Sequence, residues 1–170
     1  MTSVLAIDLG GSSGRAVLAE ISKNGQIKLK EVTRFGDYMI TNGQKVSWNF
    51  SKLMNEIKKA IMLAEKITPN FDSLAVDTWG VDFGVLDDSG QLKTDPRAYR
   101  DSYTNGMFKM IPSHLSKRLL YLETGIQSME INTLFQILAQ KKLGLLEVTD
   151  SILLMPDLIN YHLTGEKKQN

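Results

Sequence analysis

The sequence contains no cysteine and only two histidines, His114 and His162, in 170 residues. The lack of cysteine excludes disulfides, thiolate zinc sites and a cysteine nucleophile, and the scarcity of histidine makes a histidine-rich metal site unexpected. No apolar run is long enough to span a membrane, and the N-terminus lacks the basic and apolar regions of a secretory signal. These absences predict a protein of the reducing cytoplasm.

An excess of charge of one sign is also missing, because 20 basic and 19 acidic residues leave a net charge of +1. A balance this close to zero gives no sign of a large basic face for nucleic acid. The hydrophobic content of 42% and the charged content of 23% are typical of a soluble globular protein. The length corresponds to about one domain, and the chain shows no internal repeat.

The first part of the chain predicts strands joined by short turns. Apolar residues from Val4 to Ile7 and from Arg15 to Ile21 predict two strands. Alternation from Ile27 to Thr33 predicts a third strand, and Asn24-Gly25 before it is a strong hairpin signal. Residues 36–45 lose this pattern, which favours a loop or short edge strands.

A helix is predicted after these strands. Asn49 or Ser51 can cap it, and Thr68-Pro69-Asn70 ends it. Its apolar face recurs at helical spacing and comprises Phe50, Leu53, Met54, Ile57, Ile61 and Ala64. Two further strands are predicted, Ser73 to Thr78 and Val81 to Leu86. The resulting order of three strands, a helix and two strands indicates an α/β fold in which strands and helices do not simply alternate.

The second half of the chain is predicted to be mainly helical. The candidate helices are Ser102 to Ile111, Ser116 to Glu123 and Thr133 to Lys142. A last helix is predicted to start at Pro156, which is favourable in a first turn, and to end at Gly165.

The loop between the first two strands carries an acid, glycines, serines and an arginine, in the order Asp8-Leu9-Gly10-Gly11-Ser12-Ser13-Gly14-Arg15. Glycine lets backbone N–H groups converge on one anion, so the loop suits a phosphate held together with a metal ion. A glycine-rich hairpin with a solvated acid is an equally good interpretation of the loop alone. The loop lacks a Lys-Ser/Thr ending and leads into a strand, which excludes a P-loop and a dinucleotide fingerprint.

Two further clusters combine carboxylates with aromatic residues. In the first, Asp77 and Asp82 flank the Trp79-Gly80 turn between strands. Such a pair can bind sugar hydroxyls beside an aromatic platform, or the acids can cap their own hairpin turn. In the second, Tyr99-Arg100-Asp101 places a guanidinium beside a carboxylate, which can orient a polyol or form a plain ion pair.

Taken together, these segments resemble the N-terminal domain of the FGGY carbohydrate kinases and, within that family, the rhamnulokinases. The first and last matching stretches are shared across the superfamily, whereas Asp77-Thr78-Trp79-Gly80-Val81-Asp82-Phe83 is the specific one. The matching stretches follow the family's order along the whole chain: Asp8 to Arg15, Asp77 to Phe83, Ala98 to Asp101, Thr124 to Gln127, Asn132 to Gln136, and Met155 to Gly165.

The resemblance implies an actin-like, ribonuclease-H-like α/β domain with a mixed sheet and flanking helices. It implies that Asp8 helps to position Mg²⁺ through water. The residues implied to contact the phosphates of ATP are Gly11, Ser12, Ser13, Gly14 and Arg15. The ketose is expected to contact Gly80. Further contacts with the sugar are expected from Trp79, Asp82 and Arg100. The chain has Tyr103 where rhamnulokinases commonly have arginine, which leaves a second arginine contact without support.

The implied reaction is transfer of the γ-phosphoryl group of ATP to the 1-hydroxyl of L-rhamnulose, in L-rhamnose degradation. No motif in residues 1–170 matches the family's catalytic aspartate or adenosine pocket. The catalytic base is therefore expected downstream, in a C-terminal domain that is absent from this chain, and the chain alone is predicted to be inactive. The alternatives are another FGGY kinase, acting on fuculose, xylulose or a similar sugar, and a non-catalytic sugar- or anion-binding module on the same scaffold. Neither nucleic acid nor a membrane is an expected partner.

Overall fold

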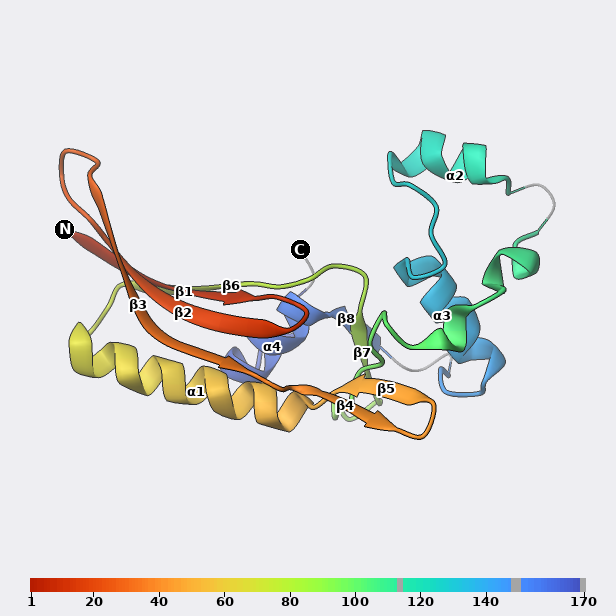
Figure 1. The fold of residues 1–170 in the computed structure, drawn as a ribbon, viewed down its shortest axis with the longest axis horizontal. Helices are drawn as coiled ribbons and strands as arrows, with labels where there is room; N and C mark the ends of the chain where they lie inside the picture. The colour runs from red at the N-terminus through yellow and green to blue at the C-terminus, as the bar shows by residue number, and fades with distance from the viewer. Residues whose placement is uncertain (113–114, 148–150, 169–170) are drawn as a thin grey trace.

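The computed structural model describes residues 1–112, 115–147 and 151–168. A four-stranded sheet has the order β3-β2-β1-β6, and it is mixed because β1 is antiparallel to β2 and parallel to β6 (Figure 1). Its strands are β1 (Thr2–Leu9), β2 (Ser13–Ile21), β3 (Ile27–Gly36) and β6 (Ser73–Asp77). These strands confirm the sequence prediction, including the turn at Gly25, which has a φ of +79°.

One face of this sheet is covered by α1 (Phe50–Ile67) and α4 (Met155–Thr164) (Figure 1). Successive residues of a strand point to opposite faces. Leu5, Ile7 and Leu9 of β1 are at most 2% exposed on the covered face, where they share one core with both helices. Asp8 therefore lies on the face that the two helices leave open.

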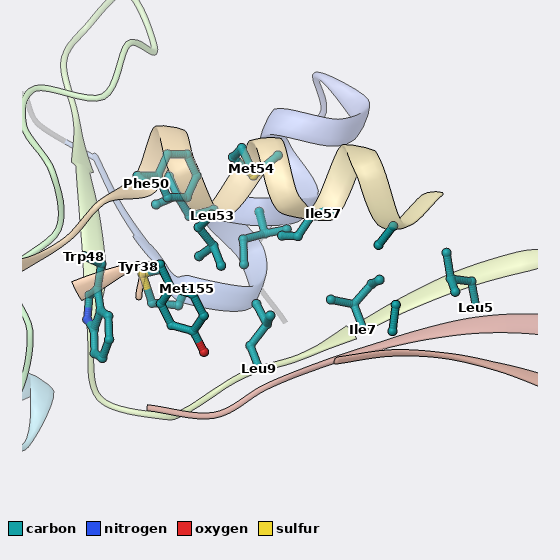
Figure 2. Close-up of a cluster of buried hydrophobic side chains, with 14 of the residues drawn as sticks. Leu5, Ile7, Leu9, Tyr38, Trp48, Phe50, Leu53, Met54, Ile57 and Met155 are labelled. Atoms are coloured by element: carbon teal, nitrogen blue, oxygen red, sulfur yellow. The ribbon is translucent and has the colours of Figure 1, made fainter. Parts of the chain in front are cut away.

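Helix α1 has the sequence signals of a surface helix. Asn49 caps its first turn by accepting a backbone N–H at 2.9 Å, and the helix ends at Thr68-Pro69-Asn70, both as predicted. Its buried face confirms the predicted pattern, except that Ala60 is buried and Ile61 only partly so. Figure 2 shows this face packed into the core, with Tyr38 beside the end of β1.

Two strand pairs extend beyond the four-stranded sheet. The first is a short hairpin of β4 (Met39–Asn42) and β5 (Lys45–Trp48), within a segment that the sequence assigned to a loop or edge strands. The second pairs β7 (Phe83–Leu86) with β8 (Ser151–Leu154), a strand that no sequence signal predicted. The interpretation of residues 73–86 as a hairpin is wrong, because β6 and β7 belong to different sheets.

The second half of the chain contains α2 (Lys117–Thr124) and α3 (Thr133–Lys142), which confirms two predicted helices. Pro156 in the first turn of α4 and Gly165 at its C-cap confirm the last one. Helices α2 and α3 lie at the opposite end of the molecule from the turn between β2 and β3 (Figure 1). No helix in the described part of the chain is both long and apolar enough to cross a membrane.

The helix predicted from Ser102 to Ile111 is wrong. Two 3₁₀-helices take its place, η1 (Ser102–Thr104) and η2 (Met107–Met110). Gly106 separates them with a φ of +81°, a left-handed conformation that an α-helix cannot contain. Met107 packs with α3 in a small second core, so this segment is held by tertiary contacts.

Candidate functional site

Three charged residues lie side by side on the open face of the sheet, where β1 and β6 end. The register pairs Asp8 of β1 with Arg15 of β2 and with Asp77 of β6, so all three side chains leave the same face. Arg15 donates to the Asp8 carboxylate from Nε at 2.8 Å and from Nη2 at 2.7 Å. The side chains of Asp8 and Arg15 are 44% and 48% exposed, so a ligand can reach both.

The loop after Asp8 is held in a tight turn. The N–H of Gly10 donates to the Ser13 carbonyl at 2.9 Å, and the Gly10 carbonyl accepts the hydroxyl of Tyr38. Burial, together with the nearby Asp8 charge, raises the pKa of Tyr38 to about 12. The hydroxyl therefore stays protonated at neutral pH and remains a donor to the loop.

The residues predicted to contact phosphate differ in their surroundings. Ser12 and Ser13 are exposed at the tip of the loop, and Gly11 is partly exposed. Gly14 is buried, and a Cβ there would lie 2.7 Å from the ring of Phe35. Close packing explains the glycine at position 14, and phosphate contact remains a prediction for the whole loop.

Arg100, which was predicted to contact the sugar, lies against this loop. A Cβ at Gly11 would be 2.6 Å from the hydroxyl of Tyr99 and 3.4 Å from Nη2 of Arg100. Arg100 is exposed and donates from Nε to the Tyr99 hydroxyl at 3.3 Å. Two clusters that are far apart in sequence therefore form one continuous surface.

Asp101 holds the segment that carries Arg100 in place. It is 4% exposed and accepts the backbone N–H groups of Val46 and Tyr103, each at 2.8 Å. It also forms an ion pair with Arg97. The plain ion pair predicted for this cluster is therefore present, but its cation is Arg97 instead of the adjacent Arg100.

Asp82 is a buried acceptor at the centre of the site. It is 1% exposed, and one of its oxygens accepts the indole N–H groups of Trp48 at 2.7 Å and Trp79 at 3.0 Å. The same oxygen accepts the backbone N–H of Tyr99 at 3.1 Å, and the other accepts the side-chain amide of Gln136 at 2.8 Å. This carboxylate therefore joins β5, the turn after β6, the Tyr99 segment and α3.

These contacts bear on the sugar contacts predicted for Trp79 and Asp82. Both carboxylate oxygens face protein donors, and the ring of Trp79 packs against Trp48 with centroids 4.1 Å apart. Burial raises the pKa of the Asp82 carboxyl above its ordinary range, more than the four hydrogen bonds lower it. The environment supports a positioning role for Asp82, and direct sugar contact by either residue remains a prediction.

The raised pKa makes the stability of the fold depend on pH through Asp82. Its stabilising contribution is fully present below the pKa of the unfolded state, about 3.9, and is lost as the pH rises through the higher pKa of the folded state. We expect the unfolding free energy of the wild type, minus that of Asp82→Asn, to decrease as the pH rises from about 4 to 7.

Urea unfolding of both proteins at several pH values measures this difference. Hydrogen bonds lower the pKa values of Asp72, Asp87 and Glu130, and these acids contribute equally to both proteins. Their effects therefore cancel in the subtraction. A difference that is constant or grows with pH would contradict a raised pKa for Asp82.

The turn before Asp82 is strained. Val81 has a φ of +73°, which β-branched residues rarely adopt, and the Asp82 N–H donates across it to the Gly80 carbonyl at 3.0 Å. This geometry is a γ-turn centred on Val81. The Val81 carbonyl accepts the hydroxyl of Thr133 at 2.9 Å and the amide of Gln136 at 3.3 Å, so α3 holds the turn. A Cβ at Gly80 would meet nothing within 4 Å, so this residue faces open space.

Tyr103, which stands where the resemblance implied an arginine, supports the same arrangement. Its hydroxyl donates to Oε1 of Gln136 at 2.6 Å, and the guanidinium of Arg97 lies 4.8 Å from the centre of its ring. Burial raises the pKa of Tyr103 well above its ordinary value, so the hydroxyl remains a donor. Because Oε1 is taken in this way, the Gln136 amide N–H faces Asp82.

His162 is not part of this site. His162 packs edge-on against Phe50 with ring centroids 4.7 Å apart, and its Nδ1 lies 2.9 Å from the Leu158 carbonyl. His114 lies outside the described residues. Among the residues that the structure describes, no three His, Cys, Asp or Glu side chains are grouped so that they could hold a metal ion.

Two residues join the site although sequence reasoning gave them no role there, namely Tyr38 and Gln136. Asp77, which the sequence paired with Asp82, lies beside Asp8, and Ile7-Asp8 and Val76-Asp77 are two apolar runs that each end in aspartate. Two such runs in neighbouring parallel strands place their acids together. No local pattern marks Tyr38 or Gln136, whose partners are distant in sequence.

Comparison with known proteins gives relatives for nearly the whole chain. The rhamnulokinase of Oceanobacillus iheyensis is 41% identical over 165 residues, which are 96% of this chain and 35% of the relative. The rhamnulokinase of Lactiplantibacillus plantarum is 38% identical over 165 residues, 97% of this chain and 33% of the relative. The chain therefore spans about a third of the length of the curated relatives it matches. No family model matches it.

Solved structures share the fold. The ligand-bound xylulose kinase of Lactobacillus acidophilus has a TM-score of 0.81 at 16% identity, over 98% of this chain and 34% of that one. Plasmodium falciparum glycerol kinase with ADP has a TM-score of 0.63 at 14% identity, over 97% of this chain and 35% of that one. The actin-like α/β fold with a mixed sheet and flanking helices is thereby confirmed. In sequence the chain is similar to rhamnulokinases over nearly its whole length, and its fold is that of the FGGY carbohydrate kinases.

Proposed function

We propose that this chain is the N-terminal domain of a kinase that transfers the γ-phosphoryl group of ATP to the 1-hydroxyl of L-rhamnulose, in L-rhamnose degradation. The observation that carries the proposal is the contact at Gly11. There the loop of residues 8–15, which suits an anion, lies against Arg100 and Tyr99, and the N–H of Tyr99 donates to Asp82. Groups suited to phosphate lie on one side of this contact and groups suited to a polyol on the other. The rhamnulokinase relatives support L-rhamnulose as the ketose.

The loop has the groups that a phosphate requires. Arg15 is a charged donor, and the exposed serines at positions 12 and 13 add hydroxyl groups. The glycines allow backbone N–H groups to approach an anion closely. Positive charge held here would stabilise the negative charge of the transferred group, which is the main task in phosphoryl transfer.

Asp8 and Asp77 fit a magnesium ion bound with a nucleotide. Magnesium keeps several waters and takes only one or two protein carboxylates when phosphate oxygens complete its shell. These two acids are neighbours on parallel strands, and both are accessible. When bound, MgATP supplies the phosphoryl group and neutralises part of its charge. Asp8 would hold the hydrated ion, and Arg15 would keep the carboxylate oriented.

We place the catalytic base and the adenosine pocket in a C-terminal domain beyond residue 170. A carboxylate must accept the proton of the attacking hydroxyl. Asp82 is buried among four donors, and Asp8 is paired with Arg15, so neither is free for this task. The whole kinase is proposed to act in the cytoplasm on ATP and a small ketose.

The proposal predicts different outcomes for the isolated chain and the complete gene product. The complete product should release ADP when given ATP and L-rhamnulose, whereas the isolated chain should fold and release none, because it lacks the base. A coupled ADP assay measures both, with L-fuculose and L-xylulose as parallel substrates and circular dichroism as the folding control.

Each of the other outcomes of this assay has its own meaning. Ketose-dependent ADP release by the pure chain would show that the base lies within it. A higher kcat/KM for fuculose or xylulose would favour another FGGY kinase. Sugar binding without turnover by the complete product would favour a binding module.

A further inference from the structure

A groove lies between the turn at Gly80-Val81 and the segment that connects α2 to α3. Its volume is about 380 Å³, within the range of about 300–1,000 Å³ that is usual for small-ligand sites. The apolar residues on its wall are Val81, Leu120, Ile126, Leu134 and Phe135. Ile126 and Leu134 are 59% and 42% exposed, so apolar surface stands open next to Gly80.

Three of the four polar side chains on the wall, all except Ser128, donate hydrogen bonds to the protein's own backbone. The hydroxyls of Thr124 and Thr133 and the amide of Asn132 donate to backbone carbonyls at 2.7, 2.9 and 2.8 Å. Within the described parts of the chain, no charged side chain lines the groove. A ligand hydroxyl placed against the apolar side chains of Ile126 and Leu134 would lose water without an equivalent partner, whereas a methyl group has no such cost.

A series of contacts connects the phosphate loop to this groove. Gly11 lies against Tyr99, and the N–H of Tyr99 donates to Asp82. The N–H of Asp82 closes the γ-turn onto Gly80, and Gly80 lines the groove. In the proposed reaction, carbon 1 of the ketose must reach the phosphoryl group at the loop. Carbon 6, at the other end of the sugar, is then directed along this series toward the groove.

We propose that the groove binds the methyl end of a 6-deoxyketose, and that Leu134 and Ile126 set the preference for a sugar without a 6-hydroxyl. The inference rests on the proposed function and names the residues that determine which ketose is preferred. L-Rhamnulose and L-fructose form a matched pair of ligands, because they differ only by the hydroxyl on carbon 6. An apolar pocket discriminates against an added hydroxyl by at most about 100-fold.

NMR titration of the ¹⁵N-labelled chain with each sugar tests this role. L-Rhamnulose should shift the amides of Gly80, Ile126 and Leu134 and bind at least about tenfold more tightly than L-fructose. Leu134→Asn should bring the two dissociation constants to within about twofold of each other, since it offers the 6-hydroxyl a partner. The matched control is Leu122→Asn, because Leu122 is a leucine of α2 that is 66% exposed and does not line the groove.

The outcomes separate this inference from the proposed function. Equal affinity for the two sugars, or a wild-type ratio in both Leu134→Asn and Ile126→Asn, would overturn the role of the groove and leave ketose binding in place. Rhamnulose-induced shifts confined to other surfaces would do the same. If neither sugar shifts any amide, ketose binding by the chain is overturned, and the inference falls with it.

Discussion

Asp8→Ala is expected to lower the kcat of the complete kinase by at least about 100-fold while leaving its fold intact. Asp8 is the acid that Arg15 orients on the open face of the sheet, next to the proposed phosphate loop. Its loss would leave a bound magnesium ion without this carboxylate. The fold should tolerate the change, because exposed ion pairs contribute only about 0–1 kcal/mol to stability.

Glu31→Ala is the matched control for this prediction. Glu31 and Arg34 form an exposed ion pair of 2.7 Å on β3 of the same sheet, and Glu31 is 47% exposed. Steady-state kinetics at saturating ATP, magnesium and L-rhamnulose measure kcat, and thermal unfolding reports the fold. The control should keep wild-type kcat. Wild-type turnover in Asp8→Ala would show that this carboxylate has no role with the metal.

Asp82→Ala is expected to reduce the unfolding free energy of the chain by about 3–5 kcal/mol. The substitution leaves two indole N–H groups, one backbone N–H and one amide without their acceptor. Each buried donor left without a partner costs about 1–3 kcal/mol. Burial disfavours the charged carboxylate, as its raised pKa indicates, so relief of that cost offsets part of the loss.

Urea unfolding measures this loss, and Asp88→Ala is its control. Asp88 lies in the turn after β7 and is exposed, so its replacement should change stability by no more than about 0.5 kcal/mol. Asp82→Asn keeps the size of the side chain and one acceptor oxygen, so its loss should fall between the two. A loss for Asp82→Ala as small as that for Asp88→Ala would show that the four donors find other acceptors.

The elements that the sequence predicted correctly are those whose signals are local. The first three strands follow from alternating apolar residues and from the turn at Gly25. The N-cap at Asn49 and the end of α4 at Gly165 each depend on hydrogen bonds within a few residues. Such signals depend on the backbone and side chains of neighbouring residues, so they can be read without knowledge of the fold.

The errors occur where distant segments decide the local structure. Residues 81–86 looked like the second arm of a hairpin, but Val81 forms a γ-turn and the strand pairs with β8 instead. Asp101 accepts the N–H of Val46 in β5 and pairs with Arg97, although Arg100 is its neighbour in sequence. The segment around Gly106 packs against α3 as two short 3₁₀-helices instead of extending one helix.

The sequence by itself determined the α/β class, the family resemblance and the loop that combines Asp8 with glycines and Arg15. Its acid, glycines and arginine are neighbours in the chain, so their chemistry can be inferred from spacing alone. Only the tertiary structure decided that Gly11 meets Arg100, that Asp82 is buried among four donors, and that Gly80 opens onto an apolar groove. These features depend on packing between segments that are far apart in sequence, and burial determines there whether a carboxylate can meet a ligand or must hold the protein together.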